Sequence, residues 1–221
     1  EEAGRSVITG DPLRKGLPAS TGGSTKDFPD FYADLSASPL KRANTLRGYR
    51  WAGVDVGERQ AYLWRINPER PLKERLRNGF KNYFSNLLYL STFDMSDEAL
   101  TRYAGALRRY RPDILIGYPS ALELFVQFCA RTGERGPRPR AVVTSGEMLL
   151  LRQRERIEGY FSCPLFDRYG IREFGDIAHE CEKHDGMHLF ADLFHVEILD
   201  KGGNPVKPGE AGELVVTDLS N

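Results

Sequence analysis

The chain has 221 residues, 40% of them hydrophobic and 28% charged, and its 31 Lys and Arg are balanced by 31 Asp and Glu. This composition predicts a folded globular protein, and the zero formal net charge gives no reason to expect nucleic acid or an anionic membrane as a partner. No apolar run is long enough to span a membrane, and the three cysteines are too few for a disulfide framework, so we expect a cytoplasmic protein.

The chain up to residue 38 is rich in Gly, Ser, Pro and Asp and is expected to be loop-like. A helix is predicted from Pro39 to Trp51, because Ser38 can cap its first turn and proline is favoured at the first helical position. The short aromatic run Gln60–Trp64 predicts a buried strand. The basic stretch 65–81 also carries acidic residues and predicts a solvated helix face.

From Leu87 onward, strand-like and helix-like segments alternate. Strands are predicted at 87–93, 113–116, 141–144 and 165–169, with helices at 97–110, 120–131 and 149–161 between them. This alternation predicts an α/β fold with a largely parallel βαβ sheet. After Gly175 the helices stop, and strands at 187–191, 194–200 and 213–217 predict an appended antiparallel β meander. The expected domains are 1–38, 39–175 and 176–221.

Small or polar residues follow three of the predicted parallel strands, at Gly117–Ser120, Thr144–Glu147 and Tyr169–Glu173. Ligands of parallel sheets bind beyond the carboxyl ends of the strands. Any one of these segments could be an ordinary turn, since turns after strands need glycine. Three together, each with a hydroxyl or carboxylate, favour a binding site.

The run Ser20–Lys26 combines four hydroxyl side chains, two glycines and a lysine. Glycines expose backbone N–H groups, hydroxyls donate to phosphate oxygens, and lysine adds positive charge, so the run suits a loop that holds polyphosphate. It lacks the glycine spacing of a Walker A loop. The alternative is a flexible Ser/Gly linker.

All four histidines lie between His179 and His195, close to Cys181. The Cys181–His184 and His184–His188 spacings suit zinc, which takes thiolate and imidazole ligands tetrahedrally. The alternative is a polar loop with exposed histidines and one buried cysteine.

Several of these segments resemble one known family. Ser20–Thr25 is similar to the phosphate loop of acyl-adenylate-forming (AMP-binding) enzymes, Tyr169–Glu173 to their Tyr-Gly-x-x-Glu motif, and Gly209–Thr217 to their Gly-x-x-Gly-Glu-Leu-x-x-Thr strand. With Ser145–Glu147 and the segment 180–188, the chain resembles the phenylacetate–coenzyme A ligase-like branch, which includes relatives encoded with capsular polysaccharide genes. The motifs occur in the family's order and cover the chain from about Pro18 onward. The implied fold is that of the family's N-terminal domain.

The resemblance implies a role for each motif. The phosphate loop would hold the phosphates of ATP, with Thr21 as a catalytic residue, and Glu173 would be catalytic by holding Mg²⁺. The loop residues concerned are Ser20, Thr21, Gly22, Gly23, Ser24 and Thr25. Further nucleotide contacts would come from Ser145, Gly146, Glu147, Asp167, Arg168, Tyr169 and Gly170. The acyl pocket would be lined by Tyr118, Pro119 and Ile171.

Two further features follow from the resemblance. Some members of this branch carry a structural Zn²⁺, which would select Cys181 and His188, with His184 as a local alternative; the family's downstream Cys-x-Cys is not in this sequence. Lys26 stands where the family's loop continues with glycine, and a side chain at a position of positive φ costs about 1 kcal/mol or more. This departure keeps a non-catalytic nucleotide- or zinc-binding module open as an alternative.

The function implied is an ATP-dependent carboxylate–CoA ligase, which forms an acyl-adenylate and passes the acyl group to coenzyme A. The expected substrate is an aryl or arylacetic acid such as phenylacetate, and the assembly considered is a homodimer. An adenylating relative with another acceptor, for polysaccharide or cofactor modification, is the alternative enzyme. The family's catalytic-lysine domain is not in this sequence, so the chain is expected to be a central fragment and inactive in isolation.

Overall fold

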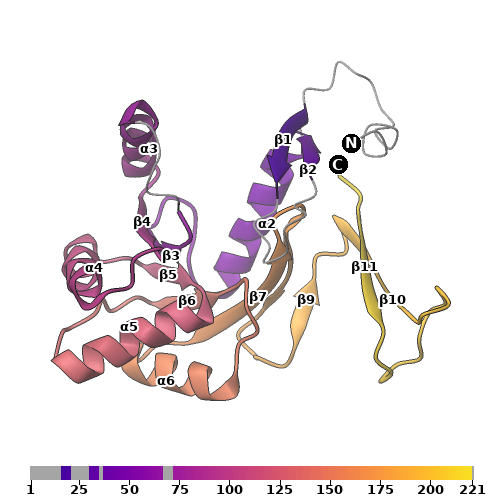
Figure 1. Cartoon of the computed structure of the whole chain (residues 1–221). Coiled ribbons are helices and arrows are strands. Elements are labelled where there is room, and N and C mark those ends of the chain that lie inside the picture. The colour runs from indigo at the N-terminus through magenta and orange to yellow at the C-terminus, as the bar shows by residue number, and fades with distance from the viewer. Residues whose placement is uncertain (1–15, 21–29, 35–36, 67–71, 221) are drawn as a thin grey trace. The chain divides into compact units, whose positions relative to one another are not determined.

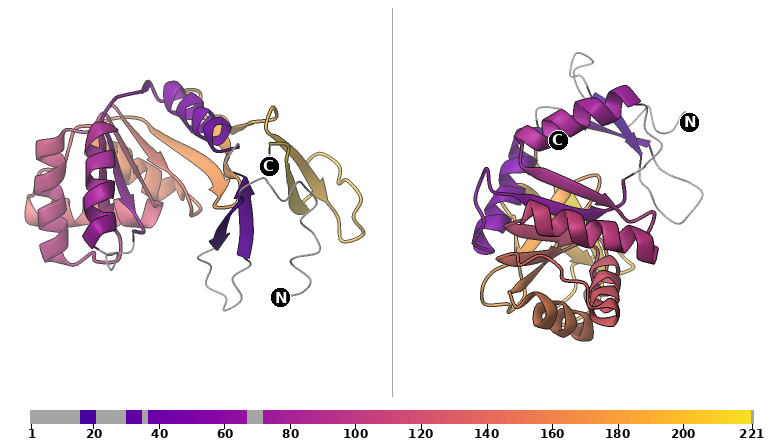
Figure 2. Two further views of the ribbon diagram at one scale, coloured as in Figure 1. Left: turned by 90° about the horizontal axis from the view of Figure 1, so that it is seen from above. Right: turned by 90° about the vertical axis from the view of Figure 1, so that its left-hand side faces the viewer.

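The structure is a computed structural model that describes residues 16–20, 30–34, 37–66 and 72–220, with side chains over 37–66 and 77–220. Two compact units make up the chain (Figures 1 and 2). The first, here called the sheet unit, comprises residues 45–170 and 176–189. The second, here called the hairpin unit, comprises residues 1–44, 171–175 and 190–221.

A seven-stranded sheet, ordered β4-β3-β5-β6-β7-β8-β9, forms the centre of the sheet unit. Its strands are β3 (Gln60–Trp64), β4 (Leu87–Ser91), β5 (Ile114–Gly117), β6 (Ala141–Thr144), β7 (Leu165–Ile171), β8 (Gly175–Glu180) and β9 (Met187–Leu189). The pairs β4–β3, β3–β5, β5–β6 and β6–β7 are parallel, and β8–β9 is antiparallel. The predicted largely parallel α/β sheet is confirmed.

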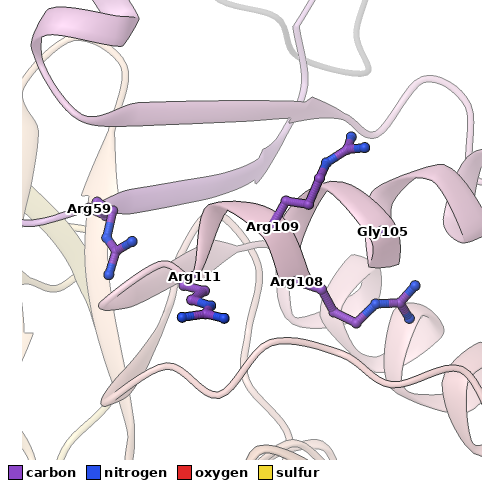
Figure 3. A pocket seen from close by; sticks show the side chains of 5 residues that line it. All are labelled: Arg59, Gly105, Arg108, Arg109 and Arg111. Carbon is purple, nitrogen blue, oxygen red and sulfur yellow. The ribbon is translucent and has the colours of Figure 1, made fainter.

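Helices connect successive parallel strands, except that the first helix, α2, precedes β3. They are α2 (Ser38–Trp51), α3 (Leu72–Phe84), α4 (Asp97–Tyr110), α5 (Pro119–Thr132) and α6 (Leu151–Phe161). At the start of α4 the backbone N–H of Ala99 donates to the Ser96 hydroxyl at 3.3 Å, and acidic residues occupy the first turn, as a helix N-terminus favours. Arg111 ends α4 in the left-handed conformation, with φ of 51° (Figure 3).

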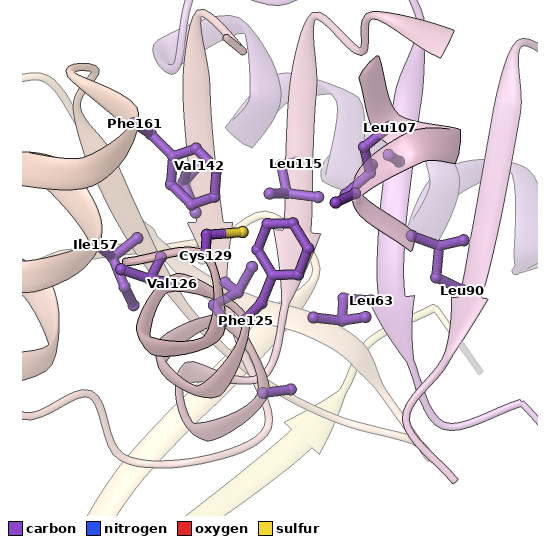
Figure 4. Packing of buried hydrophobic residues seen from close by; sticks show 14 of the residues in the cluster. Leu63, Leu90, Leu107, Leu115, Phe125, Val126, Cys129, Val142, Ile157 and Phe161 are labelled. Atoms are coloured by element: carbon purple, nitrogen blue, oxygen red, sulfur yellow. The ribbon is translucent and has the colours of Figure 1, made fainter. Parts of the chain in front are cut away.

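Two hydrophobic clusters cover the two faces of the sheet. Successive residues of a strand point to opposite faces, so Leu115 joins one cluster while Ile114 and Ile116 join the other. The larger cluster takes Leu107, Phe125 and further side chains from α4, α5 and α6 (Figure 4). The smaller cluster packs against the last turns of α2. The central strands β3, β5 and β6 are therefore buried on both faces, which explains why they are short apolar runs.

The hairpin unit contains two separate antiparallel pairs. In one, β1 (Gly16–Ser20) pairs with β2 (Asp30–Asp34); in the other, β10 (Phe194–Leu199) pairs with β11 (Glu213–Asp218). The expectation of loop throughout the first 38 residues is wrong over β1 and β2, because backbone hydrogen bonds hold a strand pair even where Gly, Pro and Asp disfavour strands.

The predicted C-terminal strands are present, but they divide between the two units. Strand β9 pairs with β8, a strand that was not predicted from the sequence. This pairing extends the large sheet. Only β10 and β11 form the appended antiparallel pair. Among the described residues, no helix combines the length and the apolar character that crossing a membrane requires. The division into 1–38, 39–175 and 176–221 stays a prediction.

Candidate functional site

The carboxyl ends of β3, β5, β6 and β7 meet at one edge of the sheet, because these strands are parallel neighbours. Gly117 pairs in register with both Leu63 and Thr144, and Thr144 pairs with Asp167. The structure therefore brings together the predicted segments Gly117–Ser120 and Thr144–Glu147 with Asp167, close to the start of the third predicted segment, Tyr169–Glu173, whose residues 171–173 belong to the hairpin unit. This edge is the position at which open parallel sheets bind ligands.

Glu147 joins two of these segments. The Ser120 backbone N–H donates to Glu147 Oε2 at 3.1 Å, and the Ser120 hydroxyl donates to Oε1 at 2.9 Å. Ser120 lies in the first turn of α5, where a carboxylate is favoured by the unpaired N–H groups and the helix dipole. Glu147 thus holds the loop after β6 against the start of α5, and the sequence did not reveal this pairing.

A glycine and two aromatic rings form the middle of the site. Gly146 has φ of 81°, and a Cβ atom added to it would lie 2.8 Å from Cε1 of Tyr118. The Tyr118 ring stacks on Trp64, with ring centroids 4.3 Å apart and planes 15° apart. Only glycine combines this backbone conformation with so close an approach to the ring. The sequence motifs did not predict Trp64 as a site residue. Its position at the end of the predicted strand Gln60–Trp64 could have indicated it, because ligands bind beyond strand ends.

Arg168 is buried behind this aromatic pair. Its Nη1 donates to Asp176 Oδ2 at 3.0 Å and to the Tyr49 hydroxyl at 3.2 Å. The guanidinium carbon lies 5.9 Å from the centroid of the Trp64 ring, within the range of a cation–π contact. Arg168 and Asp176 side chains are each only 9% exposed. This geometry makes Arg168 a support for Trp64, while its contact with nucleotide stays a prediction.

Asp167 presents a partly buried carboxyl group at the end of the paired part of β7. Burial raises its pKa above the usual range, against the opposing effect of the Thr144 hydroxyl, which donates to Asp167 Oδ1 at 2.7 Å. The Asp167 backbone N–H donates to Glu180 Oε2 at 2.8 Å, and Arg154 Nη2 donates to both carboxylate oxygens of Glu180, at 2.7 and 2.8 Å. A raised pKa at a strand end is typical of a functional position.

Glu173 lies in the hairpin unit. Its backbone carbonyl accepts a hydrogen bond from Lys41 Nζ at 3.1 Å, and the same ammonium group is 2.8 Å from Asp218 Oδ2. Burial would raise the pKa of Asp218, but hydrogen bonds from Lys41 and Ser220 outweigh it, and the pKa falls below its usual range. Within the described part of the chain, no hydrogen bond or ion pair involves the half-buried Glu173 carboxylate. That carboxylate fits the role of a ligand to a cation, and its binding of Mg²⁺ stays a prediction.

The predicted phosphate loop is not described beyond its first residue. Ser20 ends β1, and the residues from Thr21 through Lys26 lie outside the described part of the chain. The roles assigned to Ser20, Thr21, Gly22, Gly23, Ser24 and Thr25 therefore stay predictions, as does the effect of Lys26.

The residues expected to bind zinc have other neighbours. His184 Nδ1 lies 3.3 Å from Glu180 Oε2, and the His188 ring packs against Trp51, with centroids 5.1 Å apart. Cys181 is a partly exposed free thiol. Over the described residues, no group of three or more His, Cys, Asp and Glu side chains could hold a metal ion. The zinc site is not supported by this geometry, and zinc binding stays a prediction.

Comparisons with known proteins extend the fold assignment. No protein-family model matches the sequence, and no curated protein matches it. Among solved structures, 2-hydroxyisobutyryl-CoA ligase in complex with 2-HIB-AMP and CoA has a TM-score of 0.71 at 16% identity, over 92% of this chain and 45% of that one. VinN has a TM-score of 0.62 at 20% identity, over 91% of this chain and 49% of VinN.

An acyl-CoA synthetase of Brucella canis is also similar, with a TM-score of 0.63 at 19% identity, over 90% of this chain and 36% of that one. The chain therefore spans less than half the length of these proteins. At this level of identity the comparison shows a shared fold. The chain has the fold of a part of adenylate-forming CoA ligases, which is the fold that the motif resemblance implied.

Proposed function

We propose that this chain is the nucleotide-binding part of an ATP-dependent carboxylate–CoA ligase of the acyl-adenylate-forming type. The observation that carries the proposal is the meeting of the segments Gly117–Ser120 and Thr144–Glu147 with Asp167 at the carboxyl edge of a sheet whose fold is that of CoA ligases. A carboxylate substrate would attack the α-phosphorus of ATP and release pyrophosphate, and the acyl group would then pass to the thiol of coenzyme A.

Nucleotide binding is supported by the residues present at this edge. The Gly146 backbone, the exposed Tyr169 ring and the carboxyl group of Asp167 offer a flat surface and hydrogen-bonding groups to a purine. The phosphates would be held by Ser20–Thr25. Glu173 would hold Mg²⁺, which when bound supplies positive charge that offsets the charge of the phosphates.

The aromatic pair Trp64 and Tyr118 supports an aryl or arylacetic acid as the substrate. Stacked rings offer a flat apolar wall to an aromatic acyl group, and edge or offset contacts between rings contribute about 0.5–1.5 kcal/mol beyond their buried area. Pro119 is buried directly after Tyr118 and fixes the start of α5 beside this wall. Ile171 completes the proposed set of acyl-pocket residues.

Two measurements test the proposal. The 221-residue chain is titrated with ATP and with a phenylacetyl sulfamoyl adenosine, a stable mimic of the adenylate. Gly146→Val should abolish binding of both, because the new side chain would collide with Tyr118 at a position of positive φ. Gly79→Ala is the matched control, since its added Cβ would meet no atom within 4 Å. Binding of neither compound to the unaltered chain would contradict the proposal.

The second measurement is ATP–pyrophosphate exchange by this chain joined to a catalytic-lysine domain of the family, because the chain by itself is expected to be inactive. Phenylacetate and a panel of other acids are the substrates. Glu173→Gln should lower the exchange rate on the order of 100-fold, the effect of losing one electrostatic contact in a transition state, while the exposed Glu155→Gln should leave it unchanged. Exchange without thioester formation when CoA is added would favour another acceptor. Binding of ATP with no exchange for any acid would favour a non-catalytic nucleotide-binding module.

A further inference from the structure

A second candidate site lies at the opposite end of the parallel strands. It is a surface pocket of about 610 Å³, lined by Arg59, Gly105, Arg108, Arg109 and Arg111 (Figure 3). Arg59 directly precedes β3, and Arg111 lies just before β5, so the pocket is at the amino ends of these strands. The proposed adenylation site is at their carboxyl ends. At about 3.3 Å per residue, the four residues of β5 separate the two ends by roughly 13 Å.

The pocket carries more positive charge than its neighbours neutralise. Arg108 forms an ion pair with Glu134 at 2.6 Å, and Arg59 Nε lies 3.7 Å from Asp113 Oδ2. Over the described residues, neither Arg109 nor Arg111 takes part in an ion pair or a side-chain hydrogen bond. Two exposed guanidinium groups are thus left without a counter-charge, in a chain whose formal net charge is zero.

Stabilisation of the helix does not account for the whole cluster. Basic side chains in the last turn of α4 interact favourably with the helix dipole, which explains Arg108 and Arg109. Arg111 lies beyond that turn, at a position of positive φ where glycine is the favoured residue. Arg59 comes from a different segment of the chain. Both Arg59 and Arg111 nevertheless line this pocket, for which helix stabilisation gives no reason.

The shape and chemistry of the pocket indicate phosphate groups. Gly105 adds no side chain, so the surface of α4 stays open, and the volume lies in the usual range of small-molecule sites. Arginine presents a planar fork of N–H donors that matches phosphate oxygens in a bidentate manner. In Figure 3 the guanidinium ends lie apart and point in different directions, with Arg109 directed away from the other three, so a ligand that contacts several of them must carry more than one anionic group.

We propose that this pocket binds a small molecule with two or more phosphate groups, independently of the adenylation site. The ligand would lie over Gly105, with Arg109 and Arg111 as its principal contacts and Arg59 and Arg108 at its margins. The ligand could be a nucleotide or a free polyphosphate, because both carry the phosphate groups that the pocket would recognise. Neither the motif resemblance nor the proposed ligase function assigns a ligand to this end of the sheet.

Isothermal titration calorimetry of the 221-residue chain with tripolyphosphate tests the proposal, and titration with adenosine 5′-tetraphosphate distinguishes a nucleotide from a free polyphosphate. Arg109→Ala with Arg111→Gly should weaken binding about tenfold or more, since hydrogen bonds to charged groups are lost. Glycine at residue 111 preserves the left-handed backbone. Arg109→Lys with Arg111→Lys should weaken binding less, because the positive charge remains and only the planar set of guanidinium N–H donors is lost.

The matched control is Arg102→Ala with Arg131→Ala, which removes the same charge from two exposed arginines that pair with Asp94 and Asp97. It should change the affinity less than twofold. A second variant, Thr21→Ala with Ser24→Ala, alters the predicted phosphate loop and should leave the tripolyphosphate binding that depends on Arg109 and Arg111. The proposal is overturned if the Arg109/Arg111 variant and the Arg102/Arg131 control weaken tripolyphosphate binding equally. It is also overturned if only the phosphate-loop variant loses binding, or if sulfate binds as tightly as tripolyphosphate.

Discussion

His179 is a buried residue whose protonation state is set by its surroundings. Its ring lies among Tyr49, Trp51 and Phe166, and its Nδ1–H donates to the backbone carbonyl of Glu180 at 2.7 Å. Its Nε2 atom is buried and has no hydrogen-bond partner among the described residues. Burial lowers the pKa of His179 below its usual value, and the Arg168 charge acts in the same direction. The folded protein therefore holds this imidazole neutral.

The pH dependence of stability follows from this lowered pKa. Below about pH 6.5 the unfolded chain binds a proton at His179 that the folded chain does not, so the free energy of unfolding should fall by up to about 1.4 kcal/mol per pH unit until the folded pKa is reached. Urea unfolding at pH 7.0, 6.0 and 5.5 measures this slope. Glu180, whose pKa is lowered by Arg154 and the Asp167 N–H against the opposing effect of burial, titrates below this window.

A pair of variants isolates the contribution of His179. His179→Gln should flatten the slope between pH 7.0 and 5.5, whatever its effect on absolute stability. His195→Gln, at a mostly exposed position on β10, should leave the slope as it is. An unchanged slope in His179→Gln would show that other groups produce the pH dependence.

At the scale of elements, α2 approaches β8 at a glycine. A Cβ atom on Gly48 would lie 2.5 Å from Cδ2 of His179, closer than atoms can approach without movement. Gly48→Ala should therefore destabilise the protein by about 1–3 kcal/mol, even though alanine favours a helix by about 1 kcal/mol over glycine. Gly79→Ala in α3 meets no atom within 4 Å and should be neutral or slightly stabilising. Chemical unfolding of both variants measures the difference; equal stabilisation would show that α2 can move away from His179.

The elements were predictable where a local pattern dictated them. The alternating strands and helices from Gln60 to Ile171 follow from hydrophobic runs, caps and turn residues. Strands β1, β2 and β8 were missed, because their sequences lack the apolar runs of buried strands and their pairing depends on other segments. The same holds for the site: the strand-end residues were predicted, while the contacts of Arg168 with Tyr49 and of Lys41 with Asp218 join residues distant in the sequence.

At the scale of the whole molecule, both hydrophobic core clusters belong to one part of the chain. Every residue of the two core clusters lies between Tyr49 and Phe166, within the sheet unit. The hairpin unit contributes the predicted phosphate loop, Glu173 and the ion pair of Lys41 with Asp218. The core clusters thus lie in one unit while the proposed chemistry draws on both, and the predicted phosphate-binding part should be separable from the core by truncation.

A chain cut to residues 45–189 should fold without the rest of the hairpin unit. It keeps both hydrophobic clusters and all strands of the seven-stranded sheet, so its thermal unfolding should be cooperative, with the helical signal in circular dichroism retained. It lacks Ser20–Thr25 and should not bind ATP if that loop holds the phosphates. The control is a chain of residues 45–164, which loses the buried Leu165 and Phe166 together with strands β7 to β9 and should not unfold cooperatively. Cooperative unfolding of both fragments, or of neither, would show that the core is not confined as the two clusters indicate.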